Sequence, residues 1–306
     1  MAKKAFYQMK ILYMILLALP LFTLPTLAQN NLLIFQSDFG SKDGAVSAMK
    51  GVAMSVSPEL KIFDLTHEIP PYNVWEAAYR LVQTVPYWPP GTVFVSVCDP
   101  GVGTDRKSVV LRTRSGHLLV SPDNGTLTLV AEALGIDQVY EIDEARHRRA
   151  NSEQSYTFHG RDVYAYTGAK LAAALVSLEQ VGPRLPDVVV EIAYQKPEFQ
   201  NGIISGNIPI LDVQYGNVWT SIPKALFDRL NVKPGEQILV EIYQGNNRHF
   251  QGDVPYTQTF GEVGIGKELA YFNSLLYFSL ALNQDNFAQK YHIESGPSWH
   301  IKIKKP

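Results

Sequence analysis

The segment LLIFQSDFGSKDGAVSAMKGVAMSV, residues 32–56, contains the unit that decides the first part of the fold. Residues 32–36 form a short apolar run typical of a buried strand, and residues 46–56 carry apolar side chains at helical spacing. A polar turn that contains glycine lies between them. A strand, such a loop and a helix in this order are typical of an α/β fold.

The same alternation continues along the chain to about residue 184. Apolar runs and helical spacing predict two more strands and two more helices (residues 61–66, 92–98, 74–85 and 163–175). This order favours a mostly parallel sheet. Residues 108–113 and 117–121, joined through Arg114-Ser115-Gly116, predict an antiparallel hairpin appended to that sheet.

A different pattern begins where prolines recur between residues 183 and 197. Four short runs beyond this point predict strands (residues 208–213, 237–243, 268–272 and 299–303), and one helix is expected at residues 224–230. We therefore predict an N-terminal α/β domain with a mostly parallel sheet at residues 29–190. A smaller β-rich, barrel-like C-terminal domain should occupy residues 191–306.

The composition excludes several classes of protein. The 306 residues are 46% hydrophobic and 18% charged, which argues against disorder. The formal net charge of -2 offers neither a basic surface for nucleic acid nor an acidic tail, so a small-molecule ligand is the better expectation. The single cysteine, Cys98, cannot form an internal disulfide.

The N-terminus has the features of a signal peptide at residues 1–28. Lysines precede an apolar stretch at residues 11–27, and small residues flank a cleavage position before Gln29. An uncleaved anchor is the alternative, but Pro20 and Pro25 interrupt the apolar run. We expect an exported protein, periplasmic or extracellular, that begins near Gln29 and has no stable membrane span after processing.

Polar clusters follow the first and third predicted strands, at residues 37–40 and 99–103, and another lies at the end of the second, at residues 64–67. Open α/β sheets bind ligands beyond the carboxyl ends of their strands. The site is therefore expected near these three clusters.

These clusters belong to an ordered series of motifs that resembles one family. The series comprises SDFG (37–40), DLTHEIPP (64–71), DPGVGTDR (99–106), SPDNG (121–125), TFHGRD (157–162), YGNVWTSI (215–222) and FNSLLYFSLALN (272–283). Over residues 31–303 the chain resembles the S-adenosylmethionine (SAM) hydroxide adenosyltransferases, whose relatives include the SAM-dependent fluorinase and chlorinase. The resemblance implies hydrolysis of SAM to adenosine and methionine without a metal or other cofactor. It also implies a homotrimer with sites between subunits.

Asp38 directly follows the first strand, so its carboxylate can point from the sheet edge toward a ligand. A carboxylate can accept two hydrogen bonds from the vicinal hydroxyls of a ribose, and the matching family aspartate binds the ribose. The alternative is an N-cap for the helix near Val46.

Asp99, Arg106 and His159 match the family residues around the attacking water. Displacement at ribose C5′ expels a neutral thioether, so only the water needs a positioned base. Either Asp99 or His159 could take the proton. The alternatives are a turn aspartate, a surface cation and a buried histidine with satisfied hydrogen bonds.

The remaining substrate contacts are carried over from the family positions. Two aromatic residues are expected as site walls, and four residues of the second domain match positions that bind the methionine end (Tyr72 and Phe260; Asp212, Tyr215, Asn217 and Ser274). Three positions depart from the family pattern, since Leu275, Leu276 and Leu282 replace more polar residues or an arginine.

Other chemistries remain as alternatives. His67 beside Asp64, together with His159 and Asp162, could be imagined as a metal site, but hydrogen bonds within the loop and an Arg161–Asp162 ion pair are the favoured interpretation. A halogenase is disfavoured, because a carboxylate such as Asp99 about 4 Å from a halide repels it by roughly 4 kcal/mol. A noncatalytic SAM or adenosine binding protein would not need Asp99, Arg106 and His159 together.

Overall fold

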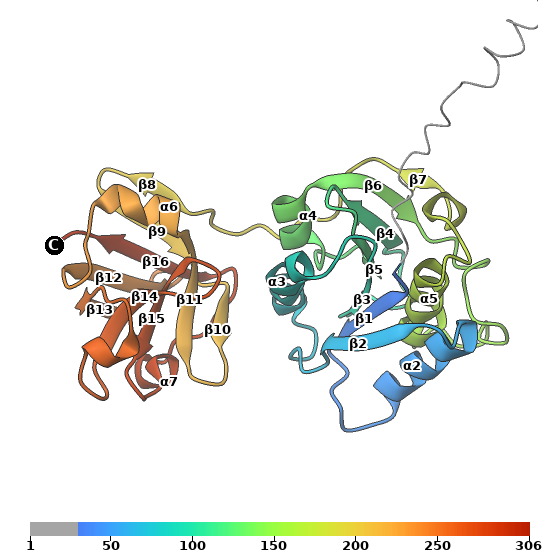
Figure 1. Cartoon of the computed structure of the whole chain (residues 1–306), viewed down its shortest axis with the longest axis horizontal. Coiled ribbons are helices and arrows are strands. Elements are labelled where there is room, and N and C mark those ends of the chain that lie inside the picture. The colour runs from blue at the N-terminus through green and yellow to red at the C-terminus, as the bar shows by residue number, and fades with distance from the viewer. Residues whose placement is uncertain (1–29) are drawn as a thin grey trace, which may run out of the picture.

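The computed structural model describes residues 30–306, so the predicted signal peptide lies outside the described residues. The chain forms two lobes joined by a strand-free segment between β7 (Arg184–Leu185) and β8 (Glu198–Gln200) (Figure 1). One lobe is an α/β domain and the other is built from antiparallel sheets, as predicted. The boundary at residue 190 itself remains a prediction.

The first lobe contains a seven-stranded sheet in the order β2-β1-β3-β5-β4-β6-β7. The strands are β1 (Leu32–Ser37), β2 (Lys61–Thr66), β3 (Val93–Val97), β4 (Ser108–Thr113), β5 (Leu118–Pro122), β6 (Ile136–Glu141) and β7. Strands β2, β1, β3 and β5 pair in parallel, whereas β4, β6 and β7 add antiparallel pairs. The sheet is therefore mostly parallel, with its parallel part under the predicted site.

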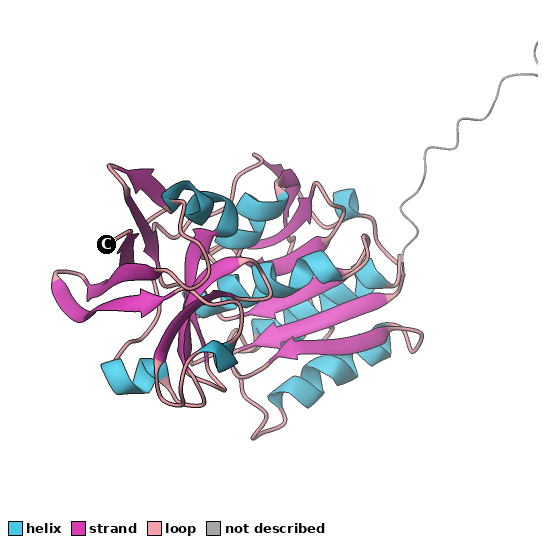
Figure 2. Ribbon diagram, turned by 60° about the vertical axis from the view of Figure 1, so that its left-hand side comes forward, coloured by secondary structure: helices cyan, strands magenta, loops and turns pink. Residues whose placement is uncertain are grey.

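The helices cover both faces of this sheet (Figure 2). Helices α2 (Ala45–Val56) and α5 (Tyr166–Ala172) pack on the face that carries Leu33 and Val95. Helices α3 (Val74–Thr84) and α4 (Thr128–Leu134) pack on the opposite face. Because both faces are covered, the central strands are continuous apolar runs rather than alternating ones.

The hairpin of β4 and β5 is not appended to the sheet, which corrects the sequence-based expectation. Strand β5 lies in the middle of the sheet, parallel to β3, and β4 continues to β6. The reason lies in the side chains, since Val109, Val110, Leu119 and Val120 are all buried. A hairpin that is apolar on both faces needs cover on both faces, which only an interior position supplies.

The second lobe consists of two antiparallel sheets packed around one core (Figure 1). One sheet has the order β10 (Ile210–Asp212), β11 (Asn217–Pro223), β15 (Tyr277–Leu282), β14 (Glu268–Phe272). The other has the order β13 (Asn247–Pro255), β12 (Gln237–Gln244), β16 (Trp299–Lys304), β9 (Ile203–Asn207), β8. A bridge between Tyr256 and Ala270 connects the two sheets. The predicted helix at residues 224–230 is present as α6 (Lys224–Phe227) followed by the 3-10 turn Asp228–Leu230.

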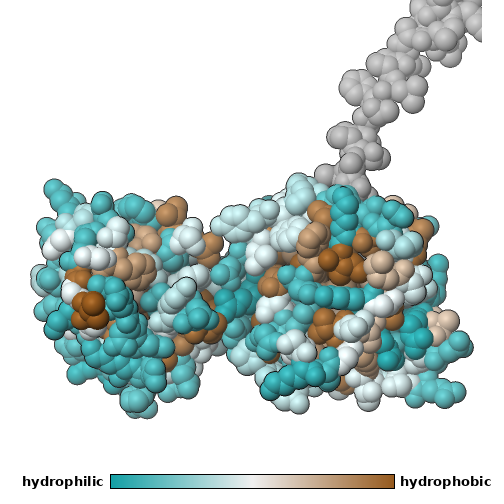
Figure 3. Space-filling model, turned by 60° about the horizontal axis from the view of Figure 1, so that its bottom comes forward, coloured by the Kyte–Doolittle hydropathy of each residue, from teal (hydrophilic) through white to brown (hydrophobic). Residues whose placement is uncertain are grey.

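The two lobes contact each other through α3 and β10. The Trp75 indole N–H donates to the Pro209 carbonyl over 2.9 Å, and Trp75 and Tyr79 pack with Ile210. A groove of about 460 Å³ lies beside this contact, where the surface narrows between the lobes (Figure 3). No helix within residues 30–306 is long and apolar enough to cross a bilayer.

Candidate active site

The ends of β1 and β3 form a pocket of about 220 Å³ in the first lobe. Asp38 and Asp99 come from the loops after these strands, Tyr72 comes from the loop before α3, and His159 comes from the loop before α5. These four predicted site residues all line the pocket. The expectation that a ligand site lies at the carboxyl ends of the parallel strands is consistent with this placement.

Asp38 is held by backbone and side-chain donors rather than capping a helix. Its Oδ2 accepts the backbone N–H of Tyr72 over 2.9 Å and lies 3.6 Å from the Cys98 thiol. Asp43, not Asp38, accepts the backbone N–H of Ala45 at the start of α2, so the N-cap alternative for Asp38 is wrong.

Three local features shape this part of the pocket. Tyr72 has a φ of +68°, a conformation rarely adopted by non-glycine residues, and it presents its N–H to Asp38. Burial, together with the neighbouring Asp38 carboxylate, raises the pKa of the Cys98 thiol, which therefore stays protonated. Asn124, from the SPDNG motif, donates to the Cys98 carbonyl over 2.8 Å and fixes the end of β3.

Asp99 and Arg106 form a buried, bidentate ion pair. Arg106 Nε lies 3.0 Å from both carboxylate oxygens of Asp99, and Nη2 lies 2.6 Å from Oδ2. The side chains are 5% and 10% exposed, so Arg106 is not a surface cation. Although burial opposes it, the hydrogen bonds that Arg106 donates to Asp99 raise the pKa of Arg106, so its guanidinium stays ionised.

His159 completes this arrangement from the other side of Arg106. Arg106 Nη2 is 3.0 Å from His159 Nδ1, and the ring is buried. The next residue, Gly160, opens a π-turn (Gly160–Ala165) that precedes α5, and a Cβ there would lie 3.1 Å from the Phe39 ring. The pKa of His159 lies below its ordinary value, because burial disfavours the imidazolium and Arg106 and Arg148 repel it.

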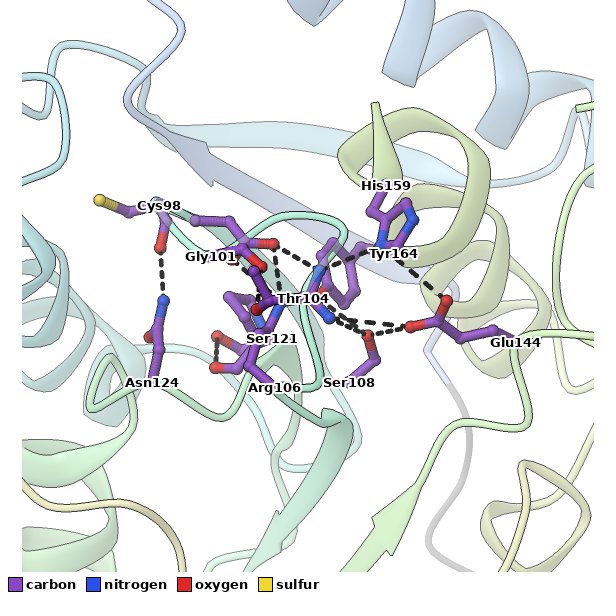
Figure 4. A network of polar contacts seen from close by, with 12 residues as sticks. Cys98, Gly101, Thr104, Arg106, Ser108, Ser121, Asn124, Glu144, His159 and Tyr164 are labelled. Atoms are coloured by element: carbon purple, nitrogen blue, oxygen red, sulfur yellow. Dashed lines mark hydrogen bonds and ion pairs between the residues drawn. The ribbon is translucent and has the colours of Figure 1, made fainter. Parts of the chain in front are cut away.

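The structure adds residues that the sequence pattern did not single out. Glu144 Oε1 accepts a hydrogen bond from Ser108 Oγ over 2.6 Å, and Arg148 Nη2 lies 3.0 Å from His159 Nε2. Figure 4 shows Arg106, Ser108, Glu144 and His159 pointing toward one another. Both Glu144 and Arg148 lie in the charged run DEARHRR (143–149), which in sequence has the composition of a solvated loop.

The candidates of the second lobe do not line this pocket. Asn217 Nδ2 donates to Asp212 Oδ2 over 3.1 Å, and Gly216 between them has a φ of +71°. Tyr215 is exposed, as is Phe260. Ser274 lies in a separate groove of about 770 Å³ between the lobes. One copy of the chain therefore brings together only the first-lobe candidates.

The other polar pairs have structural contacts of the expected kind. His67 Nε2 lies 3.1 Å from Asp64 Oδ1, and His67 Nδ1 lies 2.7 Å from Ser37 Oγ. Arg161 Nη2 lies 2.7 Å from Asp162 Oδ2, as predicted, and Asp162 also pairs with Arg149. Within residues 30–306 no group of three or more His, Cys, Asp or Glu side chains could hold a metal ion.

Comparison with known proteins assigns both lobes to one family. Residues 33–182 match the model of the SAM hydroxide adenosyltransferase N-terminal domain, and residues 206–300 match that of the C-terminal domain. The chain is 38% identical to an (R)-S-adenosyl-L-methionine hydrolase from Methanocaldococcus jannaschii, over 71% of this chain and 75% of that protein. It is 31% identical to a fluorinase from an Actinoplanes species, over 87% of this chain and 96% of that protein.

A solved structure supports the same assignment. The crystal structure of an uncharacterized conserved protein from Thermotoga maritima matches with a TM-score of 0.81 and 34% sequence identity. The match covers 90% of this chain and 100% of that one.

Proposed function

The chain belongs to the SAM hydroxide adenosyltransferase family, and we propose that it cleaves S-adenosylmethionine with water to give adenosine and L-methionine. The observation that carries this proposal is the buried Asp99–Arg106–His159 cluster at the pocket that also contains Asp38. A ribose-binding carboxylate and a proton acceptor are then within one small cavity.

In this reaction only the nucleophile, a water molecule, needs to be positioned and deprotonated. Water forms a bond to ribose C5′ from the side opposite sulfur, and the C5′–S bond breaks with its electron pair moving to sulfur. The leaving thioether is neutral, so no acid is needed there. The proton of the water passes to the Asp99 and His159 side of the pocket. The ionised Arg106 holds the Asp99 side chain in place.

Binding is divided between the lobes in this proposal. Asp38 accepts hydrogen bonds from the ribose diol, and Tyr72 and Phe260 form aromatic walls suited to adenine and the sulfonium. Asp212, Tyr215, Asn217 and Ser274 bind the methionine end. Because these second-lobe residues do not line the pocket of their own chain, we propose a homotrimer in which a neighbouring subunit supplies them.

A halogenase is the second candidate, since fluorinases are among the relatives. The Asp99 carboxylate disfavours it, because an unpaired carboxylate about 4 Å from a halide repels it by roughly 4 kcal/mol at an effective dielectric constant near 20, a repulsion that the paired Arg106 reduces but does not remove. Incubation of purified protein with SAM, with and without chloride, followed by chromatography, distinguishes the candidates. Hydrolysis gives adenosine and methionine, halogenation gives 5′-chloroadenosine, and a binding protein gives neither.

Export and independence from metals complete the proposal. The lysine-rich start and the small residues before Gln29 support cleavage of residues 1–28, which mass spectrometry of the exported protein tests. Recovery of intact Met1 in the cytoplasm would end this part. Because the thioether leaves without a Lewis acid, treatment with EDTA should not change the rate of hydrolysis.

A further inference from the structure

Behind His159 lies a second pair of charges, Glu144 and Arg148, on the segment that follows β6. Arg148 Nη2 and Glu144 Oε2 are 3.9 Å apart, and the Arg148 side chain is only 6% exposed. Arg148 Nη1 also donates to the carbonyls of Ser152 and Ser155, and its guanidinium lies over the Tyr156 ring. Arg148 therefore connects His159 to the loop that forms one wall of the pocket.

The hydrogen bonds of the His159 ring restrict where its proton can be. Nδ1 lies 3.0 Å from Arg106 Nη2, and Nε2 lies 3.0 Å from Arg148 Nη2. A guanidinium only donates, whereas a neutral imidazole has one acceptor nitrogen and one N–H. Only one of the two arginine contacts can thus be a hydrogen bond, and the N–H on the other nitrogen requires an acceptor.

The two contacts are not equivalent. Arg106 Nη2 has two hydrogens and donates one of them to Asp99 Oδ2 over 2.6 Å, so it stays hydrogen-bonded even where the ring does not accept the other. For Arg148 Nη2, His159 Nε2 is the near acceptor, since Glu144 Oε2 is 3.9 Å away. Glu144 Oε2 also lies 3.9 Å from His159 Nδ1, where a small movement lets it accept an N–H. The position of Glu144 therefore favours Nε2 as the acceptor nitrogen and Nδ1 as the nitrogen that carries the hydrogen.

We propose that Arg148 is a positioning residue that holds His159 as the neutral tautomer with hydrogen on Nδ1, and that Glu144 is the acceptor for that N–H. The roles of Arg148 and Glu144 in holding the ring do not depend on the reaction. The expected effects on the rate rest on the proposed hydrolysis of SAM. The groups that face the ring are Asp99 and Arg106 from the loop between β3 and β4, Glu144 and Arg148 from the segment after β6, and Tyr156 from the loop of His159 itself.

The neutral ring matters because the substrate is a cation. Asp99 and Glu144 offset the charges of Arg106 and Arg148, so the cluster is balanced while His159 is neutral. An imidazolium would add an uncompensated positive charge beside the sulfonium and beside Asp99. Protonation of His159 should therefore weaken substrate binding.

The same tautomer assigns the proton acceptor. With hydrogen on Nδ1 and Arg148 donating to Nε2, neither ring nitrogen can take a proton from water. The O–H bond of water then breaks toward Asp99 as the O–C5′ bond forms and the C5′–S bond breaks. Asp99 later returns the proton to solvent.

The test uses the full processed protein with ¹³C,¹⁵N-labelled histidine. NMR reports the tautomer and the pKa of each ring, and His159→Gln identifies the signal of His159. We expect hydrogen on Nδ1 in the parent protein. Arg148→Gln should raise the pKa of His159 by about one pH unit, and Glu144→Gln should lower it by about one pH unit, because a cation and an anion are removed from within about 4 Å.

Further variants and a folding check distinguish an electrostatic effect on the His159 pKa from loss of folding. Arg148→Lys keeps the charge but cannot bridge Nε2 and the loop carbonyls, so the pKa of His159 should stay near the parent value while kcat falls roughly tenfold. Arg146→Gln removes an exposed cation from the same segment and should change neither. Circular dichroism and elution volume verify that each variant is folded. The acid limb of the kcat profile should move with the pKa of His159 in every variant.

Opposite movements of the His159 pKa in Arg148→Gln and Glu144→Gln support the proposal. A hydrogen on Nε2, or movement of both variants in the same direction, overturns it. If the expected NMR shifts occur in a protein that releases no adenosine, the proposed function fails while the role of Arg148 in holding the ring stands.

Discussion

The candidate site residues of the first lobe lie together within one chain, whereas those of the second lobe do not. The side chains of Asp99, Arg106 and His159 are largely buried, and Arg106 contacts both of the others. By contrast, Tyr215 and Phe260 are exposed, and Ser274 lies in another groove. In the proposed function the groups for the chemical step are thus preorganised within one chain, whereas binding of the amino-acid end would depend on a second surface.

Asp99→Asn gives the largest expected effect and tests the proposed catalytic cluster of the first lobe. The variant should lose about 10²- to 10⁴-fold in kcat, because a positioned proton acceptor is removed. KM should change little, since Asp38 and the second-lobe residues are intact. Loss of the negative charge should also permit a trace of 5′-chloroadenosine at high chloride. Single-turnover product analysis and calorimetry measure these effects.

The matched control for this variant is Asp105→Asn. Asp105 is exposed in the same loop, so its substitution should leave kcat at the parent value. Hydrolysis by Asp99→Asn at the parent rate would reduce Asp99 to a turn residue.

Mixing of two variants tests whether each site is shared between two subunits. Asp38→Ala and Asp212→Ala should each lose about tenfold to a hundredfold in kcat/KM, since each removes a charge-assisted contact with substrate. If sites form between subunits, refolding the two together should restore about one quarter of the parent activity, because half of the first lobes meet intact second lobes half of the time.

Each variant refolded alone serves as the control for the mixture. Activity of the mixture equal to the mean of the two variants, or a fully active monomer, contradicts a shared site.

Substitution of the two aromatic wall residues should have a smaller effect on activity. Tyr72 and Phe260 are 74% and 41% exposed in one chain, and both should be covered by substrate and a neighbouring subunit. Replacing either by alanine should raise KM roughly three- to tenfold with little change in kcat. Phe63→Ala, at a similarly exposed aromatic residue of β2 that lines neither the pocket nor the groove with Ser274, is the control. Equal KM values for all three variants would contradict the placement.

The dependence of stability on pH should be the smallest effect. In the unfolded chain His159 binds a proton near pH 6.5, whereas burial and the two arginines lower its pKa in the folded chain. The unfolded state therefore binds more protons below pH 6.5, and the free energy of unfolding falls as pH drops toward the folded pKa. His147, whose pKa burial also lowers, acts in the same direction.

Urea denaturation at pH 7.5 and 5.5 measures this contribution. His159→Gln should lose less stability than the parent over that interval, because one of the two histidines no longer contributes. An equal loss in both proteins would show that the ring is not held neutral.

Patterns in the sequence predicted the fold where burial is periodic. The strand at residues 268–272 and the helix at residues 224–230 have the predicted bounds, because clear apolar runs and prolines mark their ends. Strands β8, β9, β11 and β13 were not predicted, since they are short or alternate with polar residues. Strands β6, β7 and β15 were not predicted either, although β15 is a largely apolar run. The interior position of β5 also depends on packing that no local pattern records.

The site was predictable only where the residues lie in motifs. The sequence placed Asp38, Asp99, Arg106 and His159 together because their motifs follow strand ends or match the family. Glu144 and Arg148 could not be found this way, because their roles arise from a segment that folds back on His159. Their charged neighbourhood in sequence resembles that of any exposed loop.

Hydrolysis in ¹⁸O-labelled water tests the central claim most directly. The protein is incubated with SAM in H₂¹⁸O under single-turnover conditions, and adenosine and methionine are analysed by mass spectrometry. Attack of water on ribose C5′ predicts one ¹⁸O atom in the 5′-hydroxyl of adenosine and none in methionine. Absence of adenosine, or adenosine without the label, would contradict the account.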